Sequence, residues 1–267
     1  MTRYSLGSDD HEIARLDAQA AWLDGATRLL LRAAGIGPGM RVLDLGTGLG
    51  HVALAAADLV GGEGQVVGID CSARLLGVAA GRASALPHVQ FVEGDVRTWR
   101  SEELFDAVVG RLILFHLPGP VAVLQHHIAG LRPGGRVVAL DFDLGSIRAE
   151  PSVPLVVETF ERSIAGFRSA GANPMIGTQL ALLLAEAGLA EVETFGIQRY
   201  FGPSDPLGPW MASSVMRSLA PQIVAAGIAT AEQLGLDTLN ERLAAALRAS
   251  GSVLMPPVLA GAWGLRR

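Results

Sequence analysis

The sequence predicts an α/β fold, in which a doubly wound and mainly parallel sheet carries helices on both faces. Apolar runs typical of buried strands alternate with helical segments through the first 143 residues. A glycine-rich turn over 46–50 follows the first of these runs, and the next run, 66–70, ends in the acidic residue Asp70. In open sheets of this kind, ligands bind at the carboxyl ends of the strands.

The expected elements of the first half are defined by hydrophobic spacing and by glycine-rich stops. Residues 9–34 predict a helix, because Ile13, Leu16, Ala20 and Leu23 recur near helical spacing before the Gly-Ile-Gly-Pro-Gly turn at 35–39. The further elements, in order, are a strand over 41–45, a helix over about 50–60, a strand over 65–70, a helix over 72–84, a strand over 88–93, a strand over 106–111, a helix over about 119–131 and, after the turn 132–135, a strand over 136–141.

In the second half of the sequence, the hydrophobic pattern predicts helices and two further strands. Residues 152–171, 176–187 and 207–250 have helical patterns, and 191–201 alternates in part like a strand. Residues 253–265 predict a last strand that Pro256-Pro257 makes irregular or places at an edge. These two strands bring the sheet to seven. We divide the single domain into an N-terminal helical lid over 1–35, a core over 36–145, and a C-terminal part over 146–267 with lid insertions at about 150–175 and 204–250.

Composition excludes several classes of function. The formal charge is −5 and no basic run is present, so we expect no nucleic-acid partner. All 21 basic residues are arginine, which excludes a Schiff-base lysine and a P-loop lysine. Cys71 is the single cysteine, so we expect a reducing, cytoplasmic location without an internal disulfide. No apolar stretch approaches the ~18 residues that suggest a membrane span.

The loop after the first strand predicts a nucleotide-type cofactor. Glycines at 46, 48 and 50 let backbone amides approach a ligand, and the helix that follows presents free N–H groups. Asp70 lies 20 residues beyond Gly50, where a ribose-binding carboxylate is expected. The rival cofactor NAD(P) has the fingerprint G-x-G-x-x-G, whereas His51 occupies the sixth position here.

Four ordered segments carry a family resemblance. They are 42–50, 66–72, 92–99 and 105–118, and the Leu-Arg-Pro-Gly-Gly turn at 131–135 is a further mark. Over most of 36–145 the chain resembles the class I S-adenosylmethionine-dependent methyltransferases, in particular the bacterial small-molecule branch of the ubiquinone/menaquinone type. The resemblance implies a Rossmann-like fold, S-adenosylmethionine as cofactor, S-adenosylhomocysteine as product and no metal.

The resemblance also assigns cofactor-binding residues. Asp44 is expected to meet the ammonium of the methionine part, Asp70 both ribose hydroxyls, and Arg111 the methionine or methyl end. The remaining cofactor residues that it implies are Gly46, Thr47, Gly48 and Gly50 in the loop, with Cys71, Asp95 and Val96 around the adenine. Three alternatives stay open: Asp95 as a turn cap, Cys71 as inert core and Arg111 in a surface ion pair.

Candidate catalytic and substrate residues follow the fourth and fifth strands and the added helices. We expect His116, with an imidazole near its usual pKa, to be the general base, and the alternative is a packing or capping role. Asp143 is a weaker catalytic candidate, and Asp141 lies near it in the sequence. An apolar acceptor pocket is predicted from Tyr4, Trp22, Phe160, Phe167, Trp210 and Met211, with Met175, Phe201 and Met216 as further candidates, although core packing would explain most of them. The resemblance also implies an N-terminal helix that covers the cofactor, which makes Tyr4, Gln19 and Trp22 weaker candidates there.

The expected function is methyl transfer to oxygen or nitrogen, with carbon as a variant, of a small and fairly apolar metabolite in natural-product biosynthesis. Two alternatives remain: a cyclase or isomerase that keeps the cofactor on the same scaffold, and an NAD(P)-dependent reductase. Both a monomer and a homodimer remain open.

Overall fold

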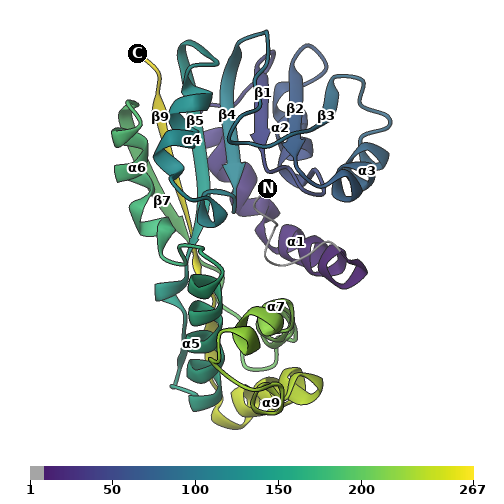
Figure 1. Cartoon of the computed structure of the whole chain (residues 1–267), viewed down its shortest axis with the longest axis vertical. Helices are drawn as coiled ribbons and strands as arrows, with labels where there is room; N and C mark the ends of the chain where they lie inside the picture. Colours follow the sequence, from purple (N-terminus) through teal and green to yellow (C-terminus); the bar gives the residue numbers. More distant parts are fainter. Residues whose placement is uncertain (1–8) are drawn as a thin grey trace.

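The computed structural model describes residues 9–267 and contains a seven-stranded sheet. The sheet lies at one end of the long axis of the chain (Figure 1). The strand order is β3-β2-β1-β4-β5-β9-β7; β1 to β5 pair in parallel, and β9 is antiparallel to both β5 and β7. The strands are β1 Arg41–Leu45, β2 Gln65–Asp70, β3 Val89–Glu93, β4 Phe105–Arg111, β5 Leu131–Asp143, β7 Ala190–Ile197 and β9 Val258–Leu265. The predicted fold class is therefore confirmed.

The sheet is apolar on both faces, because helices cover each of them. Neighbouring strand residues point to opposite sides: Val42 and Val109 pack with α1 and α2, while Leu43 and Val108 pack with the opposite cluster. The helices are α1 Asp10–Ala33, α2 His51–Val60, α3 Ala73–Arg82, α4 Pro120–Ile128, α5 Pro154–Ser169, α6 Leu180–Glu186, α7 Leu207–Ala225, α8 Ala231–Leu234 and α9 Leu236–Ser250.

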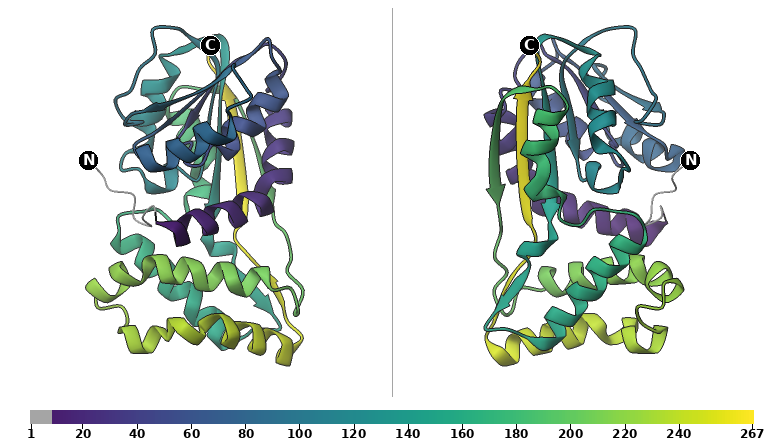
Figure 2. Two further views of the ribbon diagram at one scale, coloured as in Figure 1. Left: turned by 90° about the vertical axis from the view of Figure 1, so that its right-hand side faces the viewer. Right: turned by 60° about the vertical axis from the view of Figure 1, so that its left-hand side comes forward.

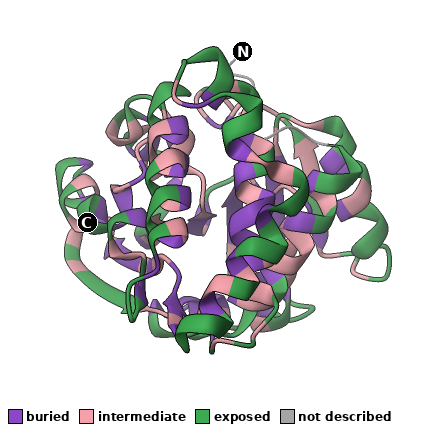
Figure 3. Cartoon of the chain, turned by 90° about the horizontal axis from the view of Figure 1, so that it is seen from below, coloured by how far each residue is buried: buried purple, intermediate pink, exposed green. Residues whose placement is uncertain are grey.

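A second layer of helices lies beyond the carboxyl ends of the parallel strands. Figure 1 shows α5, α7 and α9 stacked below the sheet, and Figure 2 shows the first half of α1 running between the sheet and these helices. Seen from below, the inward helix faces are buried and the outward faces exposed (Figure 3). Leu219 on α7 and Leu243 on α9 are buried in the same cluster as the sheet residue Val108, so the two layers share one core.

The structure departs from the expected elements at three places. Residues 131–135, expected as a turn, begin the long strand β5, with a register shift opposite Phe105 and Ala107. The helical run 207–250 divides into three helices, since Gly227 and Gly235 adopt left-handed φ of 67° and 51°. The last strand divides at Pro256-Pro257 into β8 Val253–Met255 and β9, and β8 pairs with the short strand β6 Arg148–Glu150, which the pattern did not predict.

Within residues 9–267 no helix is both long and apolar enough to cross a membrane.

Candidate active site

A cavity of about 780 Å³ lies between the carboxyl ends of the parallel strands and the second layer of helices. Its walls come from the loops after β1, β2, β3 and β4, from α1, and from α5 and α7. Segments from both halves of the sequence thus meet around one space, which has a polar end beneath the sheet and an apolar end against the helices.

The loop after β1 forms the floor of the polar end. Gly46 and Gly48 line the cavity with φ of 64° and 53°, a conformation that favours glycine. A Cβ at Gly46 would come within 2.6 Å of Ile113. Neither position tolerates a side chain without strain, so the bare backbone faces the cavity.

Asp70 at the end of β2 is held by this loop. Its carboxylate accepts hydrogen bonds from the backbone N–H groups of Gly48 and Ser72, each 2.9 Å long. Burial raises the pKa of Asp70, and these two amides partly offset the rise. The carboxylate is fixed at the cavity wall, where a ligand hydroxyl can donate to it.

Two ionisable side chains, the buried Asp44 and the half-buried Arg111, lie behind and beside the loop. Asp44 is 1% exposed and lies behind the cavity wall, and burial raises its pKa to about 7, partly offset by the Thr47 hydroxyl and the Arg111 charge. Asp44 Oδ2 and Thr47 Oγ1 have no well-formed hydrogen bond to any of residues 9–267. Arg111 lines the cavity and donates to Thr27 Oγ1 over 2.7 Å, and burial lowers its pKa to about 10, so it stays cationic at pH 7.

The loop after β3 closes the polar end at its outer side. Asp95 and Val96 line the cavity, and Arg97 pairs with the Asp95 carboxylate and holds its pKa at about 2. Asp95 Oδ1 also accepts the Arg97 backbone N–H, so the carboxylate caps its own turn as well as lining the cavity. From α4, a ring nitrogen of His127 lies 2.6 Å from the Val96 carbonyl oxygen and fixes the loop from behind.

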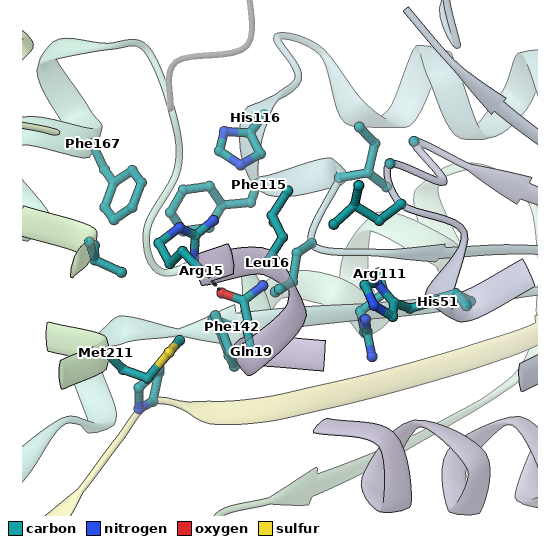
Figure 4. A pocket seen from close by; sticks show the side chains of 18 of the residues that line it. Arg15, Leu16, Gln19, His51, Arg111, Phe115, His116, Phe142, Phe167 and Met211 are labelled. Atoms are coloured by element: carbon teal, nitrogen blue, oxygen red, sulfur yellow. Dashed lines mark hydrogen bonds between the residues drawn. The ribbon is translucent and has the colours of Figure 1, made fainter. Parts of the chain in front are cut away.

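The apolar end is lined by aromatic and aliphatic side chains around a few polar groups. Figure 4 shows Phe115, Phe142, Phe167 and Met211 facing one another, with Arg15 among them. Phe115 and Phe167 meet edge to face with ring centroids 4.8 Å apart. The lining of this end of the cavity is therefore mainly apolar.

His116 lines the apolar end in a short turn, Leu114–His116, after β4. Burial, and next the charge of Arg15, lowers the pKa of its imidazole to about 4. The expectation of an imidazole near its usual pKa is therefore wrong, because desolvation and the Arg15 charge both disfavour the protonated ring. At pH 7 it is neutral, and one ring nitrogen can accept a hydrogen bond.

A sequence model of a protein family, described as "Methyltransferase domain", matches residues 36–169. The chain belongs to this family.

The methyltransferase domain has relatives of known and unknown role. It is 32% identical over 145 residues to the ubiquinone/menaquinone biosynthesis C-methyltransferase of Coxiella burnetii, a match that covers 52% of this chain and 55% of that one. It is 33% identical over 183 residues to an uncharacterized 37.1 kDa protein in a transposon of Streptomyces fradiae, covering 67% and 52%. These matches thus span about half the length of the curated relatives. The YcgJ protein of Bacillus subtilis has the same fold, with 18% identity, a TM-score of 0.59 and coverage of 91% and 99%.

The cavity of the methyltransferase domain fits the cofactor that the family uses. The bare loop at Gly46 and Gly48 lets the backbone approach an adenosyl amino acid closely, and the fixed carboxylate of Asp70 supplies an acceptor for it. The buried carboxyl of Asp44 lies behind this loop. Within the described part of the chain no group of three or more His, Cys, Asp or Glu side chains could hold a metal ion.

The structure brings most of the predicted site residues to one cavity. The cavity is lined by Gly46, Thr47, Gly48, Asp70, Cys71, Asp95, Val96, Arg111, His116, Trp22, Phe160, Phe167 and Met211. Cys71 is exposed in it, so its alternative as inert core is wrong. Arg111 is half-buried and donates to Thr27 Oγ1, and it has no ion pair with any of residues 9–267. Gly50 caps α2 with φ of 81° behind the wall.

Besides Asp44 and Gly50, several predicted residues do not line the cavity, namely Asp143, Met175, Trp210 and Met216, and Tyr4 lies outside the description. Asp143 Oδ1 accepts the Gly145 backbone N–H over 2.9 Å and caps the short turn that follows β5. Trp210 is half-buried on α7, and its side chain does not line the cavity. Tyr4 falls outside residues 9–267, which the structure describes.

The sequence analysis named Gln19 but missed Glu12 and Arg15, which lie on the same polar stripe of α1. Glu12, Arg15 and Gln19 recur at the helical spacing of the buried residues, and Arg15 and Gln19 line the cavity. The sequence did contain a signal for them, because these polar residues recur at the same helical spacing as the buried apolar residues.

Proposed function

We propose that the protein is an S-adenosylmethionine-dependent methyltransferase that acts on a small, apolar acceptor. A single observation carries the proposal: one continuous cavity holds the glycine loop with Asp70 at one end and an aromatic chamber at the other. Its volume of about 780 Å³ is near the upper end of the ~300–1,000 Å³ common for small-molecule sites, which leaves room for two ligands side by side.

The residues of the polar end would bind and orient the cofactor. Asp70 accepts from the ribose hydroxyls, Asp95 and Val96 face the adenine, and Cys71 packs against it. The carboxylate of Asp44 compensates the positive charge of the cofactor's ammonium group from behind the loop. The cationic Arg111 pairs with the carboxylate of the cofactor's methionine part. When bound, the cofactor supplies an electrophilic methyl group on a sulfonium.

The residues of the apolar end would position the acceptor and exclude water. Phe115, Phe160, Phe167 and Met211 enclose it, and the neutral imidazole of His116 accepts its proton. Positioning of this kind contributes several kcal/mol, up to about 7–11 in the best intramolecular cases. We propose helix α1 and the segments 150–175 and 204–250 as the lid that excludes solvent.

We propose oxygen or nitrogen, with carbon as a variant, as the methylated atom, and natural-product biosynthesis as the setting. The expectation of a cytoplasmic enzyme without a nucleic-acid partner belongs to the same proposal.

Titration calorimetry tests the cofactor part. Wild-type protein is expected to bind S-adenosylmethionine and S-adenosylhomocysteine but neither NADH nor NADPH. Asp70→Ala removes two charge-assisted hydrogen bonds, each about 1.5–3 kcal/mol, and should weaken binding at least about 100-fold. Asp237→Ala, at an exposed position on α9, is the matched control. Unchanged binding by Asp70→Ala would refute the assignment.

A labelled methyl group tests the reaction. The protein is incubated with methyl-labelled cofactor and a panel of small apolar hydroxyl and amino compounds, and the products are analysed by mass spectrometry. Label in the product supports transfer, whereas a converted but unlabelled product would show the cyclase or isomerase alternative and overturn the proposal.

A further inference from the structure

The segment 111–116, which begins at the last residue of β4, lines both ends of the cavity. Arg111 lies at the polar end, and Phe115 and His116 lie at the apolar end. The place of the acceptor end relative to the cofactor end therefore depends on the path of this segment.

The backbone of the segment is held in a strained conformation at its second residue. Leu112 lines the cavity with φ of 57°, in the left-handed region that a leucine rarely adopts. Its backbone N–H donates to the Leu140 carbonyl oxygen on β5 over 2.8 Å. Strained residues of this kind persist only where the surrounding structure holds them, and they cluster at functional sites.

Asp141, one residue further along β5, binds the same segment a second time. It is 1% exposed, and its Oδ2 accepts the Phe115 backbone N–H over 3.1 Å while its Oδ1 accepts that of Phe142 over 3.2 Å. Burial raises the pKa of Asp141 to about 7, and these N–H groups and that of Leu114 partly offset the rise. The carboxyl group thus binds the start of the turn after β4 from behind the cavity wall.

Stability alone does not explain a carboxyl group at this place. A carboxylate is costly to bury without a cation, and Asp141 forms no ion pair with any of residues 9–267. Its hydrogen bonds go only to backbone N–H groups of the turn and of Phe142, which itself lines the cavity. The group therefore serves the placement of the cavity wall.

We propose that Asp141 is a positioning residue for methyl transfer, whose carboxyl group fixes Phe115 and His116 at the acceptor end relative to the cofactor. This rests on the proposed function and adds to it a residue outside the cavity. Phe115 packs edge to face on Phe167 of α5, so the place that Asp141 gives to the turn also sets its contact with the second layer of helices.

The cofactor end is held by other contacts. Arg111 pairs with Leu140 in the sheet and donates to Thr27 Oγ1, and Asp70 is fixed by backbone N–H groups of the neighbouring loops. A misplacement of about 1 Å between reacting groups can cost about 100-fold in rate. Loss of the Asp141 carboxyl group should therefore lower turnover and leave cofactor affinity as it is.

The test compares Asp141→Asn with Asp106→Asn. Asparagine keeps the size of the side chain, but its amide nitrogen cannot accept a backbone N–H. Asp106 also accepts a backbone N–H, that of Arg41 over 2.7 Å, at the opposite end of β4 and outside the cavity. It is therefore the matched control.

Turnover is measured on the compound of the labelled-methyl panel that the wild-type protein methylates fastest. The number of S-adenosylhomocysteine sites, from calorimetry, corrects each rate for unfolded protein. We expect Asp141→Asn to lower kcat per site at least about tenfold and to bind S-adenosylhomocysteine as tightly as wild type. Asp106→Asn should keep the wild-type kcat per site.

The hydrogen bond itself is measured by NMR without any acceptor. In protein labelled with ¹⁵N at its eight phenylalanines, the Phe115 amide signal is assigned by its loss in Phe115→Leu. At pH 8, Asp141→Asn should move this amide proton upfield and speed its exchange with solvent, because a charge-assisted hydrogen bond is lost. Asp106→Asn should leave the signal where it is in wild type.

The results separate this proposal from the proposed function. Unchanged turnover per site in Asp141→Asn, an unchanged Phe115 signal, weakened cofactor binding, or an equal loss of turnover in Asp106→Asn would each overturn the positioning role. A wild-type protein that methylates no compound of the panel would refute the proposed function instead, and the Phe115 signal would then decide whether Asp141 holds the turn.

Discussion

The buried carboxyl of Asp44 couples cofactor binding to proton release. Its pKa of about 7 in the ligand-free protein means that it is about 90% protonated at pH 6. An ammonium within about 4–6 Å lowers a carboxyl pKa by 1–3 units, and a fall to about 5 leaves it about 10% protonated at pH 6. Binding should therefore release about 0.8 proton at pH 6, and less than about 0.1 at pH 8.

The affinity for S-adenosylhomocysteine should follow the same linkage. Protons compete with the ligand below pH 7, so binding should be about 50-fold weaker at pH 5 than at pH 8. Calorimetry at pH 6 in two buffers with different enthalpies of ionisation measures the protons released, and titrations from pH 5 to pH 8 measure the affinity.

Two substitutions test whether Asp44 is the group that releases the proton when the ligand binds. Asp44→Asn cannot titrate, so it should abolish most of the release at pH 6. Asp141→Asn is the matched control: burial raises the pKa of Asp141 to about 7 as well, but its oxygens accept the Phe115 and Phe142 backbone N–H groups and do not line the cavity. Equal proton release from wild type and Asp44→Asn would refute the reasoning.

Three further predictions concern stability and the loops around the site. First, the pKa of Asp44 is about 7 in the native state and 3.8 in the unfolded state. The native state therefore binds more protons between these values, and the contribution of Asp44 to the free energy of unfolding falls as pH rises from 3.8 to about 7. Asp44→Asn should raise the free energy of unfolding of the ligand-free protein at pH 8 by up to about 4 kcal/mol, measured with denaturant, and a less stable variant would contradict this. Second, His127→Phe loses the 2.6 Å contact with the Val96 carbonyl and should weaken S-adenosylhomocysteine binding about tenfold by calorimetry, with affinity equal to wild type as the contrary result. Third, Leu243→Ala, at a residue 1% exposed on α9, should cost about 2–5 kcal/mol and lower one common melting transition for both layers, whereas two separate transitions would show that they fold independently.

The sequence by itself determined the sheet and the cofactor end of the site. Strand periodicity and the glycine loop act over short stretches of chain, and β1, the loop 46–50 and Asp70 all lie within 30 residues. Hydrophobic alternation defined the strands, and the parallel βαβ order brought their carboxyl ends together. The predicted place of Asp70 at the cavity follows from this local pattern, whereas Asp95 and Arg111 were assigned by the family resemblance.

Only the tertiary structure decided the acceptor end. Arg15 on α1, Phe115 after β4 and Met211 on α7 are far apart in the sequence and meet because the second layer packs on the carboxyl ends of the strands. The low pKa of His116 has the same origin, because the groups that bury it and the charge of Arg15 belong to segments distant from it in the sequence. Desolvation and charge depend on what surrounds a group in space, so they appear only when the chain has folded.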